Sequence, residues 1–399
     1  MAESVKTVEL APGIRWVGVE DWHRRIFDVL IPLPYGTSYN AYLVTGQEKT
    51  ALIDTVNPGF EQELLAKIAT ITPVSKIDYL VMNHAEPDHA GNIPRVLEAA
   101  PDAKLVTNAK GADMAESLYR VPASRRLVIK DGDTLPLGGK TLKFIDAPWL
   151  HWPETMFTLA VEDKVLFSCD FFGAHIASDR LYDDEAGDIH LPEAKRYYAD
   201  IMMPFTRMVA SGLDKVAALD VKIIAPSHGP VHRNPQHIIS AYDQWARGRL
   251  EPKVVIVFVS MWGSTRKLAE PLINAISLEG IEAVPYDLAV ADTSHIARDL
   301  VDASAIVLGS PTVLGGLHPL AAYALTLVKA LRPRLKMAAY FGSYGWGGGA
   351  ANQAKSLLEP AGMEIVGAVD IKGAPGEKEL LSAAELGSTI ARRVKESRH

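Results

Sequence analysis

Four side chains that can bind a metal ion lie within six consecutive positions: His84, Glu86, Asp88 and His89. They follow the apolar residues 77–82, which are typical of a short buried strand that ends where the polar residues begin. Neighbouring carboxylates and imidazoles repel one another or compete for water unless a cation unites them. The spacing therefore predicts a metal site at the end of a strand rather than a solvated turn.

Three further candidate ligands are far apart in the sequence: His151, Asp170 and His228. Each follows an apolar run and precedes small residues or proline, as expected of a side chain held at the edge of a cleft. Taken singly, a histidine or aspartate at a strand end more often has an ordinary polar role. Their order along the chain, combined with the first cluster, favours one shared metal site.

The pattern H-x-E-x-D-H resembles the H-x-H-x-D-H signature of metallo-β-lactamase-like hydrolases, with Glu86 in place of their second histidine. A carboxylate in place of an imidazole favours iron or manganese over zinc. With the motifs L-H-W-P, C-D-x-F-G and P-S-H-G, residues 10–250 resemble the metal domain of flavodiiron proteins. The resemblance implies these ligands: His84, Glu86 and His151 for one iron ion, Asp88, His89 and His228 for a second, and Asp170 as the bridge.

Charge is consistent with this scheme. Two ferrous ions carry four positive charges, and Glu86, Asp88, Asp170 and a bridging hydroxide supply four negative ones. A nearly neutral site of this kind is the one that a dry pocket tolerates. Each metal would keep an open coordination position facing the other, which suits one or two diatomic molecules.

Two side chains are weaker candidates for a role beside the metals. His175 could line the pocket and hydrogen-bond to substrate, or it could be a satisfied polar residue beneath the site. Tyr197 lies in a Tyr-Tyr-Ala run that resembles the family's, and its hydroxyl could stabilise a bound intermediate, although such tyrosines are more often core. Cys169 is expected to point away from the site and to behave as a small hydrophobic residue.

The pattern of expected strands and helices, which must position these residues, changes near residue 250. Hairpin strands over residues 10–55, followed by strands and helices to residue 250, predict a sheet sandwich covered by helices, and residues 251–253 are expected to form the joint. The resemblance makes domain 1–250 an αββα sandwich of the metallo-β-lactamase type. In domain 251–399, regular alternation predicts a five-stranded, doubly wound parallel sheet of the flavodoxin type. Its expected strands are residues 254–259, 283–287, 305–308, 337–341 and 364–369.

Three loops at strand ends of the second domain are candidates for binding a flavin. The first joins a strand directly to a helix, where hydroxyls and free N–H groups form a phosphate cradle. The other two are apolar and rich in glycine, so that backbone amides and aromatic side chains can contact a ring. The expected contacts are Ser260, Met261, Trp262, Gly263, Ser264 and Thr265, then Pro311, Thr312, Val313, Leu314 and Gly315, then Ser343, Tyr344, Gly345, Trp346 and Gly347.

By composition alone, the three candidate flavin loops could be ordinary loops of a response-regulator-like domain. Three together resemble flavodoxin, and specifically its flavodiiron version, which implies FMN as the cofactor. The family's second loop often reads N-N-G, whereas this chain has Leu314-Gly315-Gly316. We expect the exchange to alter contacts at the flavin ring without abolishing binding.

Composition limits the partners. The formal net charge of -7 argues against nucleic acid, because phosphate binding needs a basic face. No apolar run reaches membrane-spanning length, and the first residues lack a signal-peptide segment, so a cytoplasmic protein is expected. The single cysteine, Cys169, excludes an internal disulfide and a rubredoxin-like module of its own. Electrons must then come from an external donor, for which the family implies a rubredoxin-like protein, with reduced deazaflavin or NADH as alternatives.

The two cofactors together imply a reductase of dioxygen, of nitric oxide, or of both. Reducing dioxygen to water takes four electrons and joining two nitric oxide molecules into nitrous oxide takes two, which a diferrous pair and a reduced flavin can store. Domains of this size place their strand ends tens of ångströms apart. The family therefore implies a head-to-tail homodimer, or a dimer of dimers. The alternatives are a metal-dependent hydrolase with an appended flavodoxin-like module, and a redox or gas sensor without turnover.

Overall fold

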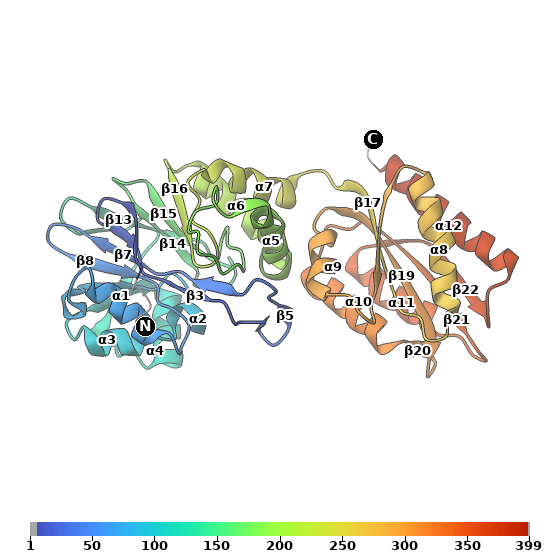
Figure 1. The fold of residues 1–399 in the computed structure, drawn as a ribbon, viewed down its shortest axis with the longest axis horizontal. Coiled ribbons are helices and arrows are strands. Elements are labelled where there is room, and N and C mark those ends of the chain that lie inside the picture. The colour runs from blue at the N-terminus through green and yellow to red at the C-terminus, as the bar shows by residue number, and fades with distance from the viewer. Residues whose placement is uncertain (1–5, 398–399) are drawn as a thin grey trace. The chain divides into compact units, whose positions relative to one another are not determined.

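The computed structural model describes residues 6–397 and divides the chain into two compact units, Met1–Ala246 and Arg247–His399 (Figure 1). Residues 1–5, on which the signal-peptide expectation partly depends, lie outside the described residues. Within the described part, no helix is both long and apolar enough to cross a membrane. Each unit has its own hydrophobic clusters, so each is described separately.

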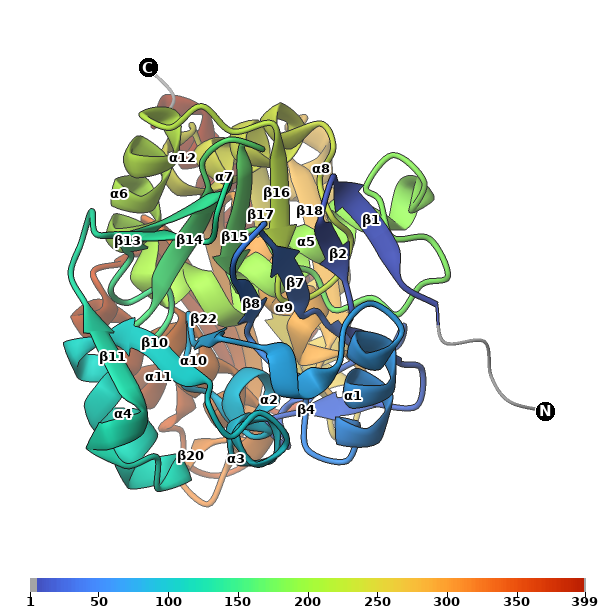
Figure 2. The same cartoon turned by 90° about the vertical axis from the view of Figure 1, so that its left-hand side faces the viewer.

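The first unit contains a seven-stranded and a five-stranded sheet (Figure 2). The larger sheet has the order β1 (Val8–Ala11), β2 (Ile14–Trp16), β7 (Tyr42–Thr45), β8 (Thr50–Ile53), β9 (Tyr79–Val81), β10 (Lys104–Asn108) and β11 (Arg126–Ile129). The smaller has β12 (Thr134–Pro136), β13 (Thr141–Asp146), β14 (Met156–Ala160), β15 (Val165–Cys169) and β16 (Ile223–Pro226). Two short ribbons are formed by β3 (Val19–Asp21) with β6 (Thr37–Tyr39), and by β4 (Ile26–Phe27) with β5 (Ile31–Pro32).

Successive side chains along the strands point to opposite faces of the sheet, and so form two separate hydrophobic layers. In β7, Leu43 packs into the cluster that includes residues of α1 and α3, whereas Tyr42 and Val44 pack into the cluster shared with the five-stranded sheet. This is the period of two that a strand buried on both faces requires. The predicted sandwich covered by helices is confirmed. Its helices are α1 (Glu61–Ala69), α2 (Pro87–Ala90), α3 (Ile93–Ala99), α4 (Ala109–Tyr119), α5 (His190–Tyr197), α6 (Thr206–Ala217) and α7 (Pro235–Arg247).

The second unit is a doubly wound sheet of five parallel strands, as predicted. The strand order is β18 (Glu282–Asp287), β17 (Glu251–Phe258), β19 (Ala303–Val313), β21 (Met337–Tyr344) and β22 (Glu364–Lys372), with β20 (Gly316–Leu317) added to β19. One hydrophobic cluster joins the sheet to α8 (Ser264–Leu278) and α12 (Glu377–Glu396). The other joins it to α9 (Thr293–Leu300), α10 (Pro319–Leu331) and α11 (Ala350–Leu358). Ligands of such sheets bind outside the carboxyl ends of the strands.

Several expected boundaries are wrong. Residues 251–253, expected as the joint, begin β17 and lie inside the second sheet. β19 and β21 continue to Val313 and Tyr344, into the segments expected to be loops. Parallel pairing of residues 305–311 with 337–343 supplies their backbone partners despite the glycines and proline.

Candidate metal centre

The seven candidate ligands lie in segments that follow strands from both sheets of the first unit. After β9, Glu86 precedes the single turn α2, which carries Asp88 and His89. Asp170 directly follows β15 and His228 follows β16. Because β15 and β16 are parallel neighbours, their carboxyl ends lie at one edge. His151 lies in the connection between β13 and β14.

Four of these side chains form one group of potential ligand atoms, all within 4.8 Å of one another. Glu86 Oε2 lies 3.2 Å from Nε2 of His84 and 3.0 Å from Nε2 of His151. Asp170 Oδ2 lies 3.5 Å and 3.4 Å from the same two nitrogens. Two imidazoles and two carboxylates therefore converge on one point.

Asp88, His89 and His228 form a second group with the same 4.8 Å limit. Asp88 Oδ2 lies 3.2 Å from His228 Nε2, and Asp88 Oδ1 lies 3.4 Å from His89 Nε2. The other oxygen of Asp170, Oδ1, lies 3.1 Å from His89 Nε2 and 3.5 Å from His228 Nε2. The two oxygens of Asp170 thus face different groups, which is the arrangement that lets one carboxylate contact two ions.

The donor atoms fit metal ions better than they fit hydrogen bonds among themselves. Ligands about 2.1 Å from an ion, at angles between the octahedral and tetrahedral values, lie roughly 3.0–3.4 Å apart, close to the spacings observed. Both carboxylate oxygens of Asp88 and Nε2 of His89 are buried without a hydrogen-bond partner among the described residues. An unsatisfied buried polar atom costs about 1–3 kcal/mol. Metal ions would remove that cost.

The carboxylates and imidazoles shift one another's pKa values strongly. Burial lowers the pKa of His89, but the carboxylates of Asp88 and Asp170 outweigh burial and raise it to about 10. Burial also lowers the pKa of His151, but the carboxylates of Asp170 and Glu86 outweigh burial and raise this pKa to about 10. Burial raises the pKa of Asp170, but nearby histidines, His89 foremost, bring it well below its usual range. Without metal, the imidazoles therefore hold protons where the ions would bind.

Glu154 contacts the candidate ligand His84, and the sequence analysis did not single it out. Its Oε1 accepts hydrogen bonds from His84 Nδ1 at 2.7 Å and from the backbone N–H of Ala85 at 2.9 Å. This leaves His84 Nε2 to face the ligand group, as in other carboxylate–histidine–metal arrangements. Only its position three residues after His151 could have marked it, because its partner lies 70 residues away in sequence. His228 is oriented similarly, since its Nδ1 lies 2.6 Å from the carbonyl oxygen of Ser38.

The Glu154→Gln variant is expected to bind iron about 10–100-fold more weakly, because the amide is a poorer acceptor for His84 Nδ1–H. Iron affinity can be measured by competition with a chelator. Glu98→Gln, on the exposed surface of α3, serves as the control and should bind iron like the unaltered protein. Equal affinities for the two variants would show that Glu154 does not position the ligand.

Tyr197 and His175 both lie beside the ligand groups. Tyr197 donates its hydroxyl hydrogen to Asp170 Oδ1 at 2.9 Å, and burial raises its pKa well above the usual value, so the phenol stays protonated. Burial and the neighbouring His228 lower the pKa of His175, which is therefore neutral. His175 Nδ1 lies 2.9 Å from Thr37 Oγ1, while its buried Nε2 has no partner among the described residues.

The expectation that Cys169 points away from the centre is wrong. Its thiol lies 3.8 Å from Asp170 Oδ2 and shares a group of potential ligand atoms with His89 and Asp170. Cys169 has a left-handed backbone conformation, with φ of 52°, so the strand's alternation breaks there. Burial raises the pKa of the thiol well above its usual value, which keeps it protonated and a poor ligand.

The candidate flavin residues lie at the carboxyl ends of β17, β19 and β21. Ser264 and Thr265 open α8, whose N-terminus follows Gly263 with φ of 91°. Gly315 and Gly349 bring the second and third loops together, because a Cβ at Gly349 would lie 2.0 Å from the carbonyl oxygen of Gly315. The side chains with the largest exposed fractions among these residues are Trp262 (92%), Leu314 (104%) and Trp346 (98%).

Exposed aromatic side chains gathered on loops indicate a binding surface. Trp262 and Trp346 come from two different loops at the same sheet edge. Together with the N–H groups of Ser264 and Thr265 in the first turn of α8, they suit a ligand with a flat ring and a phosphate. The described residues therefore fit FMN.

Two protein-family models match the chain, one in each unit. The model described as the ODP family beta lactamase matches residues 37–229. The flavodoxin model matches residues 256–387. The metal centre and the three candidate flavin loops thus fall in separate matched regions.

Whole-chain relatives have the same two parts. The chain is 38% identical over 394 residues to a nitric oxide reductase from Moorella thermoacetica, covering 97% of this chain and 98% of the relative. It superimposes with a TM-score of 0.95 and 33% identity on the rubredoxin oxygen:oxidoreductase of Desulfovibrio gigas, covering 98% and 99% of the two chains. The flavodiiron protein of Giardia intestinalis gives a TM-score of 0.95 at 32% identity, covering 99% of this chain and 98% of that chain.

Proposed function

Because this chain belongs to the flavodiiron protein family, we propose that it reduces dioxygen to water, nitric oxide to nitrous oxide, or both, at a diiron centre supplied with electrons by FMN. The observation that carries this proposal is Asp170, whose two oxygens face two separate groups of ligands. A mononuclear site would not need this arrangement. Glu86, where zinc hydrolases of this fold have histidine, supports iron.

The reaction sets the demand for electrons and protons. One dioxygen needs four of each to give two water molecules, and two nitric oxide molecules need two of each to give nitrous oxide and one water. When bound, two ferrous ions and a reduced flavin supply two electrons each, enough for either reaction. The chain's own residues must then hold the cofactors, orient their ligands and deliver protons.

We assign the ligands by group. His84, Glu86 and His151 would hold one ion and Asp88, His89 and His228 the other, with Asp170 between them. Tyr197 keeps Asp170 in place through its hydroxyl, 2.9 Å from Oδ1. His175 is neutral, and its buried Nε2 has no hydrogen-bond partner among the described residues, so this nitrogen would be placed to hydrogen-bond to a substrate next to the centre.

FMN would be held by the second unit. The N–H groups of Ser264 and Thr265 at the start of α8 would bind the phosphate. Trp262, Leu314 and Trp346, all exposed, would cover the ring. The electron donor is then an external one, and a rubredoxin-like protein is the first choice, with reduced deazaflavin or NADH as alternatives.

We further propose a head-to-tail homodimer, alone or paired into a tetramer, in which each subunit's flavin serves its partner's irons. Electron transfer requires the two cofactors to lie close together, and the exposed aromatic side chains of the flavin loops are suited to burial against a second copy. Sedimentation velocity, combined with activity, tests this. A monomer with full gas-reducing activity would contradict it.

The function is tested by side-by-side steady-state rates with the two gases, using an artificial reductant. Protein loaded with iron and FMN is expected to consume at least one gas, giving water without superoxide from dioxygen, or nitrous oxide from nitric oxide. The ratio of the two rates identifies the working substrate. If the loaded protein consumed neither gas, the proposal would be wrong.

A further inference from the structure

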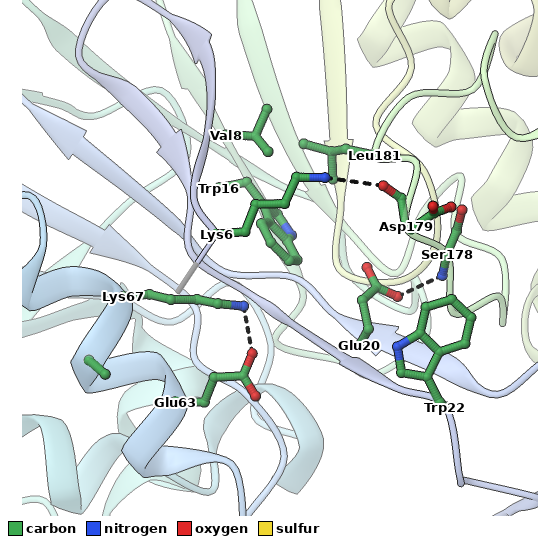
Figure 3. A pocket seen from close by; sticks show the side chains of 11 residues that line it. Lys6, Val8, Trp16, Glu20, Trp22, Glu63, Lys67, Ser178, Asp179 and Leu181 are labelled. Atoms are coloured by element: carbon green, nitrogen blue, oxygen red, sulfur yellow. Dashed lines mark hydrogen bonds and ion pairs between the residues drawn. The ribbon is translucent and has the colours of Figure 1, made fainter. Parts of the chain in front are cut away.

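A cavity of about 440 Å³ lies in the first unit, and none of the residues assigned above to the metal centre lines it. Its walls come from the chain leading into β1, from β2, β3 and α1, and from residues 178–181 (Figure 3). Val8, Ala66 and Leu181 supply apolar surface, and Trp16 and Trp22 supply aromatic surface. Cavities of roughly 300–1,000 Å³ with apolar walls and a few polar groups are typical small-molecule sites.

Five ionisable side chains line the cavity: Lys6, Glu20, Glu63, Lys67 and Asp179 (Figure 3). Glu20 Oε2 accepts a hydrogen bond from the backbone N–H of Ser178 at 2.9 Å. Lys6 Nζ donates to the carbonyl oxygen of Asp179 at 3.2 Å. These contacts fix a carboxyl group and an ammonium group on the cavity wall.

Most of the other charge around the cavity is already paired. The buried ammonium of Lys67 lies 2.6 Å from Glu63 Oε1, donates to the carbonyl oxygen of Gly18 at 2.5 Å, and sits 4.5 Å above the ring of Trp16. The carboxylate of Asp179 is exposed and lies 3.8 Å from Arg180. Lys6 and Glu20 are left to set the charge that a ligand would meet.

Beside the ammonium of Lys6 on the cavity wall, the ionisation of Glu20 also bears on which ligand fits. Burial raises the pKa of its carboxyl to about 8, against the lowering effects of the Ser178 N–H, Lys67 and Lys6, while Glu63 adds to the rise. At pH 7 the carboxyl is therefore mostly protonated and presents an O–H donor. The four charged side chains that remain on the cavity wall, Lys6, Lys67, Glu63 and Asp179, then sum to no net charge, and Lys6 is the ammonium among them that forms no ion pair with a carboxylate of the described residues.

We propose that this cavity binds a small organic monocarboxylate with a flat apolar body. The ligand carboxylate would accept the O–H of Glu20 and face the ammonium of Lys6, both of them strong charge-assisted interactions. Its body would contact Trp16 and Trp22. A cationic ligand would instead meet two lysines and would need Glu20 to ionise.

Hydrogen bonds also connect the cavity wall to the loop that carries the candidate metal ligand His228. Trp16 Nε1 donates to Asn40 Oδ1 at 2.8 Å, and Asn40 Nδ2 donates to the carbonyl oxygens of Pro226 and Gly229, each at 2.9 Å. These two residues flank the loop that carries His228. Two hydrogen-bonded side chains, Trp16 and Asn40, would therefore separate an occupant of the cavity from that loop.

Calorimetric titration of the cofactor-loaded protein with 2-naphthoate tests the proposal without any measurement of turnover. Binding is expected at pH 7 and should be about tenfold weaker at pH 9, because a carboxyl with a pKa of about 8 goes from roughly nine-tenths to one-tenth protonated. The uncharged 2-naphthamide and the cation 2-naphthylmethylammonium should bind more weakly at pH 7. No binding of 2-naphthoate at millimolar concentration, or tighter binding of the cation, would overturn the proposal.

Two variants locate the site. Glu20→Gln stays uncharged and keeps a hydrogen-bond donor, so it should bind 2-naphthoate within a few-fold of the unaltered protein at pH 7 and lose the weakening at pH 9. Lys6→Met should weaken binding of 2-naphthoate but not of 2-naphthamide. Unchanged melting temperatures and FMN content confirm that the variants fold. A pH dependence that survived in Glu20→Gln would place the bound anion elsewhere and refute the assignment.

Discussion

Replacing Asp170 with asparagine is expected to lower gas reduction by more than about 100-fold, beyond the usual cost of altering an outer partner of a metal ligand. Asparagine offers one oxygen and no charge, so it cannot serve both ligand groups that Asp170 faces. It also leaves the buried positive charge of two metal ions less compensated. Iron per chain and steady-state rates with both gases measure the effect.

A matched control separates the loss of the bridge from the loss of any buried carboxylate. The side chain of Asp183 is also nearly buried in the first unit, but its partners are the backbone N–H of Arg233 at 2.9 Å and His232 at 3.8 Å rather than a candidate ligand. Asp183→Asn should keep its iron and most of its activity. If Asp170→Asn retained two irons and normal rates, Asp170 would not be the bridge.

Loading the metal-free protein with ferrous iron at pH 7 is expected to release at least two protons per chain. Both His89 and His151 have a pKa of about 10 without metal, and an imidazole must lose its proton before it binds a metal. Two released protons make iron binding about 100-fold tighter for each unit of rising pH in this range. Proton release can be recorded in weakly buffered solution under anaerobic conditions, and chelator competition at two pH values gives the affinity.

The same pKa shifts predict how the metal-free protein's stability depends on pH. A histidine whose folded pKa is raised stabilises the fold fully below its unfolded value of about 6.5, and this stabilisation disappears as pH rises through about 10. The metal-free protein should therefore lose stability over that range, and the iron-loaded protein much less. Iron uptake without proton release would contradict the pKa shifts and the ligand assignment together.

The sequence predicted both folds because its strong patterns are local. Runs such as residues 254–258 are buried on both faces of a parallel sheet and read as continuous apolar strands. Amphipathic helices α4 and α12, and the edge strand β11, were not predicted. Their patterns alternate with many polar residues, and only packing against the sheets shows which face is buried.

The candidate ligands were found from the sequence, whereas the residues that orient them were not. His84 and Glu86 stand two positions apart, so their joint role is visible locally. Glu154 acts on His84 across 70 residues, and Thr37 contacts His175 across 138. Contacts between residues so far apart in the sequence depend on how the two sheets and their loops pack together, and the position of Glu154 three residues after His151 is the one local sign of either contact.

Leu314, which departs from the family pattern, has a backbone conformation that is unfavourable for leucine. It occupies a tight turn between β19 and β20 with φ of 50°, followed by Gly315 with φ of 79°. Asparagine tolerates such left-handed positions better than leucine does. The fully exposed leucine therefore stands in a turn that disfavours it, which is expected where contact with a ligand matters more than local stability.

Iron and flavin analysis of anaerobically purified protein tests the central claim most directly. We predict two iron ions and one FMN per chain, with zinc well below one ion per chain. A folded protein containing two zinc ions, or a single metal ion, would contradict a diiron centre bridged by Asp170.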